Sequence, residues 1–238
     1  MKKLTGIFVS SLFLISAAWA ADDSLTDIER LGKRIYKDRN MSSYGTQSCR
    51  DCHHPISGFA DPTNHLDPYT NFVSTGADGV SKGGRNAPSA AYAGFSPKLH
   101  VNEAGDYVGG MFWDGRADGS ELGDPLAEQA QGPPLNPVEM AMDDEQAVID
   151  AIADSDYVNL WINVFGAGSL DDVGKAYDNF GRAIAAYERS TEVTKFSSKF
   201  DTGGLSKVER AGQALFERNC ASCHRSEEHT SELQSRQS

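Results

Sequence analysis

Two short cysteine motifs constrain the fold of this chain more than any other feature of its sequence. Both read Cys-x-x-Cys-His. Their residues are Cys49, Cys52, His53, Cys220, Cys223 and His224. Two thiols at this spacing can each form a thioether with one vinyl group of a haem, and the adjacent histidine then reaches the iron as its proximal ligand. The two motifs use all four cysteines of the chain, so we predict two covalently bound haem c groups.

The same cysteine spacing also occurs in zinc half-sites and in thioredoxin-like redox pairs. A zinc site that used all four thiols would not require a histidine directly after either pair. Two copies, each followed by histidine, therefore favour haem, with His53 and His224 as the iron ligands.

Composition limits the classes of function that fit this chain. It has 238 residues, of which 39% are hydrophobic, which is enough for one large or two small packed domains. Its formal net charge of -12 argues against nucleic-acid binding, because that function needs a basic surface.

Residues 1–20 have the pattern of a secretory signal peptide. Lys2 and Lys3 give a positive start, residues 6–17 are mostly apolar, and residues 18–20 form a small-x-small cleavage site. The apolar run is shorter than the ~20 residues that a membrane-spanning helix needs, which disfavours the alternative of an uncleaved anchor. We predict export to the periplasm, cleavage near Ala20 and no membrane span in the mature chain.

The periodicity of apolar residues predicts a mainly α fold. It predicts helices over residues 24–38, 143–153, 156–164 and 171–190, and a further helix that begins after Ser206. Polar residues at helix starts predict the N-terminal caps. The expected cap pairs are Ser24 with Asp27, Ser169 with Asp172, and Ser206 with Glu209.

The helices that precede the two cysteine motifs also match in sequence. Residues 29–32 read Glu-Arg-Leu-Gly and residues 209–212 read Glu-Arg-Ala-Gly. This similarity predicts an internal repeat of two cytochrome c-like units, although unrelated helices can share so short a match by chance. Between them, residues 55–137 are rich in glycine, proline and aromatic residues, which predicts long ordered loops around a ligand.

The segment between the two motifs carries the most specific sequence patterns. Residues 112–117 read Phe-Trp-Asp-Gly-Arg-Ala, residues 129–133 read Gln-Ala-Gln-Gly-Pro, residues 136–140 read Asn-Pro-Val-Glu-Met, and residues 85–88 read Arg-Asn-Ala-Pro. Together with the haem motifs, these runs resemble the bacterial di-haem cytochrome c peroxidase and MauG family over roughly residues 24–224.

The resemblance implies a different role for each haem. It makes His53 the proximal ligand of the peroxide-reducing haem and His224 the proximal ligand of the high-potential haem at which electrons enter. Trp113 matches the tryptophan that lies between the two haems and couples them. The alternative for Trp113 is a buried core aromatic.

Gln129 and Glu139 match the distal-pocket pair of that family. A carboxylate above the iron can move a proton between the two oxygens of peroxide, and an amide can orient peroxide without titrating. Glu139 is therefore the predicted acid–base residue and Gln129 the orienting one. Asn86 matches a ligand of a structural calcium, and Asp114 with Arg116 is expected to form an ion pair or a turn.

One departure from the family pattern concerns the peroxide-reducing haem. Family members commonly cap this iron with a distal histidine a few residues before the Asn-x-Pro segment, but residues 75–84 contain no histidine. His65, His54 and His100 are the remaining options, each more typical of a surface or capping position. The other interpretation is a five-coordinate iron at rest, nearer to the MauG-like branch.

We expect four segments along the chain. Residues 1–20 are the signal peptide, residues 21–200 form the N-terminal cytochrome c-like haem domain, and residues 201–224 begin the C-terminal one. Residues 225–238 resemble a translated sequencing adapter and are expected to be non-native. The second haem domain is therefore expected to be incomplete in this chain.

Three functions fit these residues. The first is a periplasmic peroxidase that reduces hydrogen peroxide with electrons from a small donor protein, a cytochrome c or a cupredoxin. The second is MauG-like oxidation of a protein side chain or small organic substrate, and the third is a non-catalytic di-haem electron carrier. A carrier needs no distal acid, so Glu139 and Gln129 favour an enzyme. The family resemblance also implies a homodimer.

Overall fold

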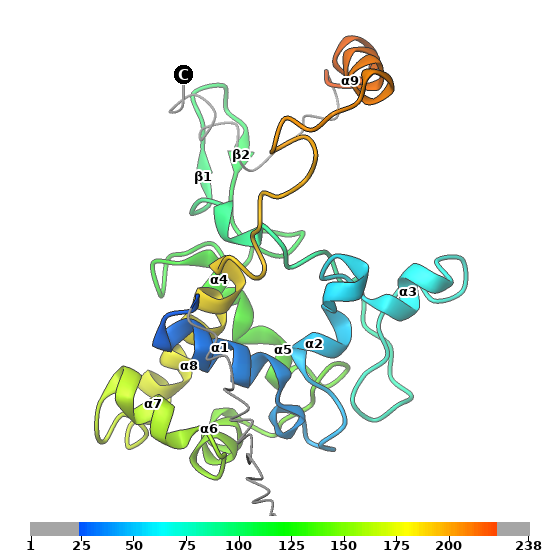
Figure 1. Cartoon of the computed structure of the whole chain (residues 1–238). Helices are drawn as coiled ribbons and strands as arrows, with labels where there is room; N and C mark the ends of the chain where they lie inside the picture. The colour runs from blue at the N-terminus through cyan, green and yellow to red at the C-terminus, as the bar shows by residue number, and fades with distance from the viewer. Residues whose placement is uncertain (1–23, 223–238) are drawn as a thin grey trace, which may run out of the picture.

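The computed structural model describes residues 24–222, and its architecture is mainly helical (Figure 1). The elements in chain order are α1 (Asp27–Lys37), η1 (Arg39–Met41), α2 (Cys49–Cys52), η2 (Pro55–Ser57), α3 (Pro62–Leu66), η3 (Ala93–Phe95), β1 (His100–Val101), β2 (Tyr107–Val108), α4 (Pro125–Ala130), α5 (Gly132–Leu135), α6 (Glu145–Ala153), α7 (Val158–Phe165), α8 (Val173–Arg189) and α9 (Lys207–Asn219). The two strands pair antiparallel as a small hairpin.

Helix α8 is the central element of the fold. It packs against α1, α4 and α6. Its apolar residues recur every three or four positions, so they lie on one side of the helix and are withdrawn from water together. The buried residues on this side include Ala176, Tyr177, Phe180, Ile184 and Tyr187. The apolar stripe predicted for this helix is therefore core.

Helices α1 and α8 cross at very short range. Leu31, Ile35 and Tyr36 of α1 are buried in the crossing, and the rings of Tyr36 and Tyr187 meet edge to face at 5.1 Å between centroids. A side chain at Gly32 would place its Cβ 1.9 Å from the backbone oxygen of Ala183. Glycine is therefore required here, because the two helix backbones leave no space for a methyl group.

The predicted helices are confirmed with small shifts at their ends. The cap of α1 was predicted wrongly. Thr26, rather than Ser24, caps this helix in a capping box with Glu29, whose carboxylate accepts a hydrogen bond from the Thr26 backbone N–H at 2.6 Å. A threonine three residues before a glutamate satisfies two backbone donors reciprocally, so Ser24 lies outside the helix.

The cap of α8 also differs from the prediction. Asp172 itself is the N-cap, and its carboxylate accepts a hydrogen bond from the backbone N–H of Lys175 at 3.2 Å. Ser169 instead accepts a hydrogen bond from the buried indole N–H of Trp161 at 2.9 Å. A buried indole N–H requires an acceptor, and Ser169 provides that acceptor instead of capping α8.

Helix α9 has the same kind of capping box as α1, and the cap predicted for it is confirmed. Ser206 and Glu209 form it, and the Ser206 backbone N–H lies 2.7 Å from the Glu209 carboxylate. The helix stands away from the body of the fold (Figure 1). Its apolar residues remain exposed, with Val208 82% and Leu215 52% accessible. The matched helices thus share their local structure and differ in packing.

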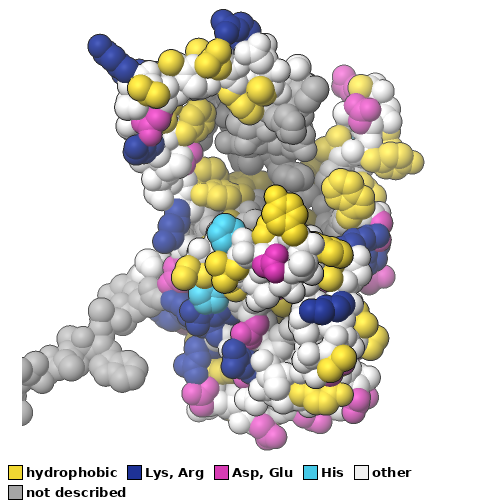
Figure 2. Space-filling view, turned by 90° about the vertical axis from the view of Figure 1, so that its right-hand side faces the viewer, with side chains coloured by type: hydrophobic (Ala, Val, Ile, Leu, Met, Phe, Trp, Pro, Cys, Tyr) yellow, Lys and Arg dark blue, Asp and Glu magenta, His cyan; other side chains and the backbone are white. Residues whose placement is uncertain are grey.

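The side of the molecule that carries α3 is viewed in Figure 2, which shows hydrophobic side chains on the surface with histidines beside them. Exposed hydrophobic residues of this segment include Ile56, Leu66, Tyr69 and Phe72. Among residues 24–222, no helix combines the length and the apolar character needed to cross a membrane. The predicted signal peptide and the tail at residues 225–238 lie outside the described residues.

We predict opposite effects for the same substitution in the two matched helices. Gly32→Ala forces a methyl group into the backbone of α8 and lowers the free energy of unfolding by about 1–3 kcal/mol. Gly212, at the equivalent position of α9, has open space around its Cβ direction, so Gly212→Ala leaves stability unchanged or raises it by up to about 1 kcal/mol through helix propensity. Urea unfolding of both variants measures the difference, and equal effects would contradict the crossing described here.

Candidate functional site

The first cysteine pair lies on helix α2, a single turn with strong local reasons to form. Ser48 and Asp51 make a capping box, in which the Ser48 backbone N–H and hydroxyl each lie 2.8 Å from the Asp51 carboxylate. Arg39 holds the other oxygen of this carboxylate at 2.7 Å. One turn of helix places Cys49 and Cys52 on the same side, three residues apart.

His53 is the C-cap of α2 and its imidazole is held from one side. Its Nδ1 lies 2.9 Å from the Pro88 carbonyl oxygen and 3.2 Å from that of Phe59. Two carbonyl acceptors require a hydrogen on Nδ1, which leaves the lone pair on Nε2. Burial lowers the pKa of His53 and outweighs the two carbonyls that oppose it, so the ring stays neutral. A neutral imidazole with a free Nε2 is the form that binds iron.

The two thiols of this motif are free and form no disulfide with each other. Burial raises the pKa of Cys52 to about 11 and raises that of Cys49 further. The Gln47 amide nitrogen lies 3.7 Å from the Cys52 sulfur and donates to the Thr75 carbonyl at 2.7 Å. Two reduced thiols beside an oriented neutral histidine fit the donor set of haem c.

Glu139 lies in a turn near these cysteines. Its backbone oxygen accepts a hydrogen bond from the Ala77 N–H at 2.7 Å. This bond joins the turn to the segment that contains Thr75, whose carbonyl accepts from Gln47 next to Cys52. Its carboxylate is close enough to raise the pKa of the Cys52 thiol. Burial raises the pKa of Glu139 itself, partly opposed by the charge of Arg116 and by the Asn136 amide. The structure therefore brings Glu139 to the first haem motif.

Gln129 is half-buried on α4. The neighbouring residues Leu126, Ala127 and Ala130 of this helix are buried, with Ala127 at its crossing with α8. Within residues 24–222, no hydrogen bond joins the Gln129 side chain to Glu139. The predicted pairing of these two side chains at one peroxide remains a prediction.

Trp113 lies at the tip of a tight turn and is 92% exposed. The alternative interpretation as a core aromatic is therefore wrong, because this turn projects its indole away from the packed helices. The predicted ion pair is present: Asp114 accepts hydrogen bonds from Arg116 at 2.9 Å and from Arg85 at 3.0 Å. The Arg116 guanidinium also lies 3.5 Å from the centre of the Phe112 ring, a cation–π contact that holds the turn.

Asn86 is part of a polar network around the loop that follows α3. Its amide nitrogen donates to the Phe72 carbonyl at 3.0 Å. Asn64 is buried beside it. When the amide of Asn64 is oriented so that its oxygen and its nitrogen both have partners, the oxygen accepts from Asn86 and the nitrogen donates to the Asn71 and Val73 carbonyls. Among residues 24–222, no group of three or more acidic, histidine or cysteine side chains forms a metal site. Calcium binding by Asn86 remains a prediction.

The three histidines considered as distal ligands have local partners. His54 accepts a hydrogen bond from the backbone N–H of Ile56 at 3.1 Å. The Nδ1 of His100 lies 2.9 Å from the Lys98 carbonyl, and His65 is exposed at the end of α3. These are capping and surface positions.

The second cysteine motif begins at the end of α9. Cys220 is the C-cap of this helix and is exposed. Cys223 and His224, the predicted remaining members, lie outside the described residues. The structure therefore positions the first motif in detail and only the start of the second.

Comparison with known proteins identifies the family. A family model described as di-haem cytochrome c peroxidase matches residues 26–208. The chain belongs to the di-haem cytochrome c peroxidase family. Membership of a di-haem cytochrome c family implies haem c as the cofactor.

The relatives of this chain include proteins named MauG and proteins named cytochrome c peroxidase. The methylamine utilization protein MauG of Paracoccus denitrificans is 40% identical over 211 residues, which cover 86% of this chain and 52% of that protein. The cytochrome c551 peroxidase of Pseudomonas aeruginosa is 30% identical over 202 residues, covering 82% of this chain and 49% of that protein. The chain thus spans about half the length of the curated relatives it matches.

A solved structure shares the fold. The crystal structure of the di-haem peroxidase BthA from Burkholderia thailandensis matches with a TM-score of 0.70 at 32% identity, over 83% of this chain and 48% of that one. Fold and sequence therefore agree on the di-haem cytochrome c peroxidase family, which includes proteins named as peroxidases and as MauG.

The sequence analysis missed several residues that shape the first haem motif. The carbonyls of Phe59 and Pro88 hold His53, and the Tyr36 hydroxyl donates to the His53 carbonyl at 3.0 Å. Glu188 is buried nearby. Backbone carbonyls leave no sequence signal, but an acidic residue within the apolar stripe of α8 is a signal that could have been followed.

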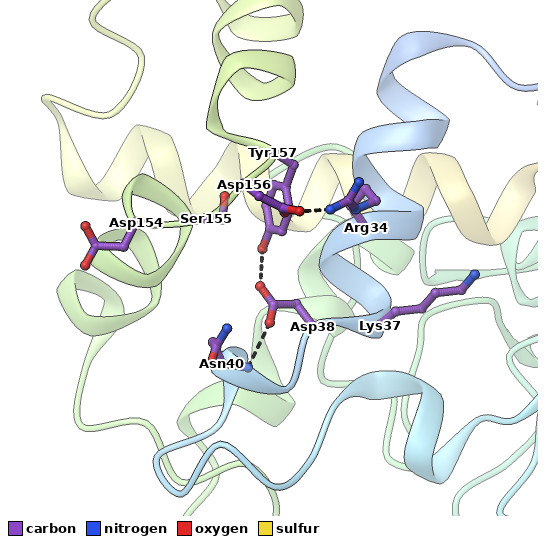
Figure 3. A pocket seen from close by; sticks show the side chains of 8 residues that line it. All are labelled: Arg34, Lys37, Asp38, Asn40, Asp154, Ser155, Asp156 and Tyr157. Carbon is purple, nitrogen blue, oxygen red and sulfur yellow. Dashed lines mark hydrogen bonds and ion pairs between the residues drawn. The ribbon is translucent and has the colours of Figure 1, made fainter. Parts of the chain in front are cut away.

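A separate polar cavity of about 460 Å³ lies between the end of α1 and the α6–α7 turn (Figure 3). Arg34 pairs with Asp156 at 2.5 Å, and the Tyr157 hydroxyl donates to Asp38 at 2.7 Å. These partners satisfy one another, and the cavity contains none of the residues predicted for the haem site.

We predict unequal reactivity of the thiols in the haem-free chain. A raised pKa lowers the fraction of thiolate, which is the form that reacts. Cys52, whose pKa is raised to about 11, should therefore react with iodoacetamide at neutral pH about 100-fold more slowly than an ordinary cysteine. Cys49 should react more slowly still. Exposed Cys220 should react first. Peptide mass spectrometry measures the order, with unfolded chain in urea as the control in which the three rates converge. Faster labelling of Cys49 than of Cys220 would contradict the burial described.

Proposed function

We propose that this chain belongs to a periplasmic di-haem peroxidase that reduces hydrogen peroxide to water with electrons from a small donor protein, a cytochrome c or a cupredoxin. The observation that carries the proposal is the first haem motif, in which His53 is held neutral with Nε2 free and the Glu139 carboxyl lies nearby. Relatives named as cytochrome c peroxidases support the peroxide chemistry. Export and cleavage near Ala20 are part of the proposal.

Cys49, Cys52 and His53 would hold the first haem, which supplies the redox chemistry for peroxide reduction when bound. The chain's own contribution begins with His53, whose orientation is set by the Pro88 carbonyl. This hydrogen bond gives the imidazole more negative character and strengthens its donation to a metal.

Glu139 is proposed to move the proton in this site. Reduction of peroxide to water requires that a proton leave one oxygen and arrive at the other, and a single carboxyl can accept it and return it. Burial raises the pKa of Glu139, which brings the group closer to the pH at which it both accepts and releases a proton. Arg116 keeps a positive charge close to Glu139 and favours the ionised form that accepts first.

Gln129 is proposed to orient peroxide by hydrogen bonding, since an amide donates and accepts without changing its charge. Its half-buried position on α4, a helix packed against α8, supports a defined orientation. We also propose that Asn86 binds a structural calcium and that the protein is a homodimer; both follow the family resemblance.

The second motif is proposed to hold the haem at which electrons enter, with Cys220, Cys223 and His224 as its attachment and ligand residues. Trp113 would lie between this haem and the first. Its 92% exposure leaves the indole accessible for contact with another part of the protein.

A MauG-like oxidase is the second candidate, favoured by two observations. The relative named MauG is 40% identical to this chain, and residues 75–84 lack a distal histidine. Such an enzyme would oxidise a protein side chain or a small organic substrate. Slow turnover of peroxide with reduced cytochrome c or cupredoxin, in a protein that contains both haems, would favour this candidate over the peroxidase.

We predict that Glu139→Gln, in protein produced from the full gene with haem-maturation machinery, lowers kcat for peroxide reduction by about 10²–10⁴-fold. Activity of the unmodified enzyme should fall as pH drops through the raised pKa of Glu139, above the ordinary glutamate value of about 4.3, because the protonated carboxyl cannot accept a proton. The variant should lack this acidic limb. Stopped-flow oxidation of reduced cytochrome c measures both.

Glu103→Gln, on the exposed hairpin turn, is the matched control and should retain full activity. The pyridine haemochrome spectrum must show equal haem content in all three proteins. Normal activity of Glu139→Gln at equal haem content would overturn the assignment of this residue, and absence of haem from the unmodified protein would overturn the proposed function.

We further predict that Trp113→Leu slows electron transfer between the haems but leaves stability almost unchanged. Because the indole is exposed in this chain, the free energy of unfolding of this chain should change by no more than about 0.5 kcal/mol. Electron transfer from the second haem to the first should become slower, as measured by stopped-flow absorbance after reduction. Tyr107→Leu is the control, since Tyr107 is also exposed, at 80%. Equal transfer rates in the two variants would contradict a role for Trp113.

A further inference from the structure

Glu188, near the end of α8, is a buried carboxyl that the proposed peroxidase chemistry does not use. It is 6% exposed. Within residues 24–222, its backbone oxygen accepts a hydrogen bond from Thr194, but no side chain or N–H donates to its carboxylate. A carboxylate with so little access to water is unfavourable, so burial favours the protonated form of Glu188.

Arg189, which follows Glu188 in the sequence, and Lys33 of α1 both pair with other carboxylates. The guanidinium of Arg189 makes two hydrogen bonds of 2.7 Å to the Asp124 carboxylate, and Lys33 of α1 pairs with Glu192 at 2.5 Å. No ion pair of Glu188 occurs among the described residues. Among the described residues, the charge of Glu188 is therefore compensated only in part, by Arg189.

The position of Glu188 is set by the crossing of α1 and α8. The adjacent Tyr187 packs edge to face on Tyr36, and the Tyr36 hydroxyl donates to the His53 carbonyl. The charge of Glu188 acts on Tyr36 and on Cys49, raising the pKa of each. The carboxyl thus lies within electrostatic range of the haem-attachment residue Cys49.

The titratable and charged groups that face Glu188 come from three helices. They are Tyr36 of α1, Cys49 of α2, and Tyr187 and Arg189 of α8. Burial raises the pKa of Glu188 to about 8, and Arg189 opposes this only in part. Cys49 ceases to titrate once it forms a thioether, and burial raises the pKa of both tyrosines. Glu188 is then the group of this set that titrates near neutral pH.

We propose that Glu188 is the proton acceptor coupled to reduction of the first haem. For each electron that an external donor delivers to the iron, the Glu188 carboxylate takes one proton from solvent and becomes a neutral carboxyl, and oxidation reverses both transfers. The inference rests on haem attachment at Cys49 and Cys52, part of the proposed function, and not on peroxide turnover.

The electrostatic reason is a change of charge at short range. An oxidised haem iron centre carries one more positive charge than the reduced centre, so the oxidised state stabilises a nearby carboxylate. In a site with little water this interaction is strong. Reduction removes the attraction, the pKa of Glu188 rises, and the proton binds. By linkage, protonation then favours reduction to the same extent.

The test is the pH dependence of the midpoint potential of the first haem. The full-length, haem-loaded protein, Glu188→Gln and the control Glu192→Gln are titrated by spectroelectrochemistry between pH 5 and 9, in a Cys220→Ser background if the two haem waves overlap. Glu192 is a nearby, partly exposed acid that pairs with Lys33, so it reports the effect of removing a surface charge.

We expect the equilibrium constant for reduction to fall by up to about tenfold per pH unit in the unmodified protein and in Glu192→Gln. Glu188→Gln should show a flat profile close to the low-pH limit, because glutamine resembles the protonated acid. Equal pH dependence with and without Glu188 would overturn the inference, as would a flat profile in the unmodified protein.

A second measurement covers the case in which Glu188→Gln does not fold. Infrared difference spectra of the unmodified protein should show the C=O band of one protonated carboxyl gained on reduction, and its absence would overturn the inference. Haem content by pyridine haemochrome separates the two failures. Lack of the first haem contradicts the proposed function, whereas a loaded haem without proton uptake contradicts only the role of Glu188.

Discussion

The close crossing of α1 and α8 is the contact on which the rest of the haem site depends. It requires glycine at position 32, because any side chain there would collide with the Ala183 carbonyl. At this separation Tyr36 packs on Tyr187 and its hydroxyl reaches the carbonyl of His53. Helix α2 is thereby connected to the core, although it is only one turn long.

Removal of water acts on several titratable groups of this site with different consequences. It lowers the pKa of His53 and so preserves the neutral ring that binds metal. It raises the pKa of Cys52 and of Glu139, because both groups are charged when deprotonated. Desolvation always disfavours the charged form. One physical cause therefore produces a metal ligand, unreactive thiols and a carboxyl that exchanges protons more readily.

Local sequence was sufficient for much of the helical structure. The apolar spacing in residues 171–190 predicted the buried side of α8, and Ser206 with Glu209 predicted the cap of α9. It was insufficient where two local solutions compete. Ser24 with Asp27 and Thr26 with Glu29 have the same spacing, and only the structure shows that Thr26 and Glu29 form the reciprocal hydrogen bonds.

The orientation of His53 was not predictable from the motif. Its Nδ1 is held by the Pro88 carbonyl, 35 residues away in sequence, and a backbone carbonyl has the same chemistry at every residue. Trp113 shows the same limit, because its sequence context fits both a core aromatic and an exposed one. Only the geometry of the turn made by Asp114, Arg85 and Arg116 decided that it is exposed.

The sequence by itself determined which residues can carry the chemistry: the thiols and histidine of the first motif, the carboxyl of Glu139 and the family to which the chain belongs. These follow from residue type and spacing, which are local properties. Only the tertiary structure decided that His53 presents Nε2, that Glu139 lies beside Cys52 and that Glu188 is buried without a hydrogen-bond donor among residues 24–222. Those features depend on burial and on contacts between residues distant in sequence, and chain spacing does not specify either one.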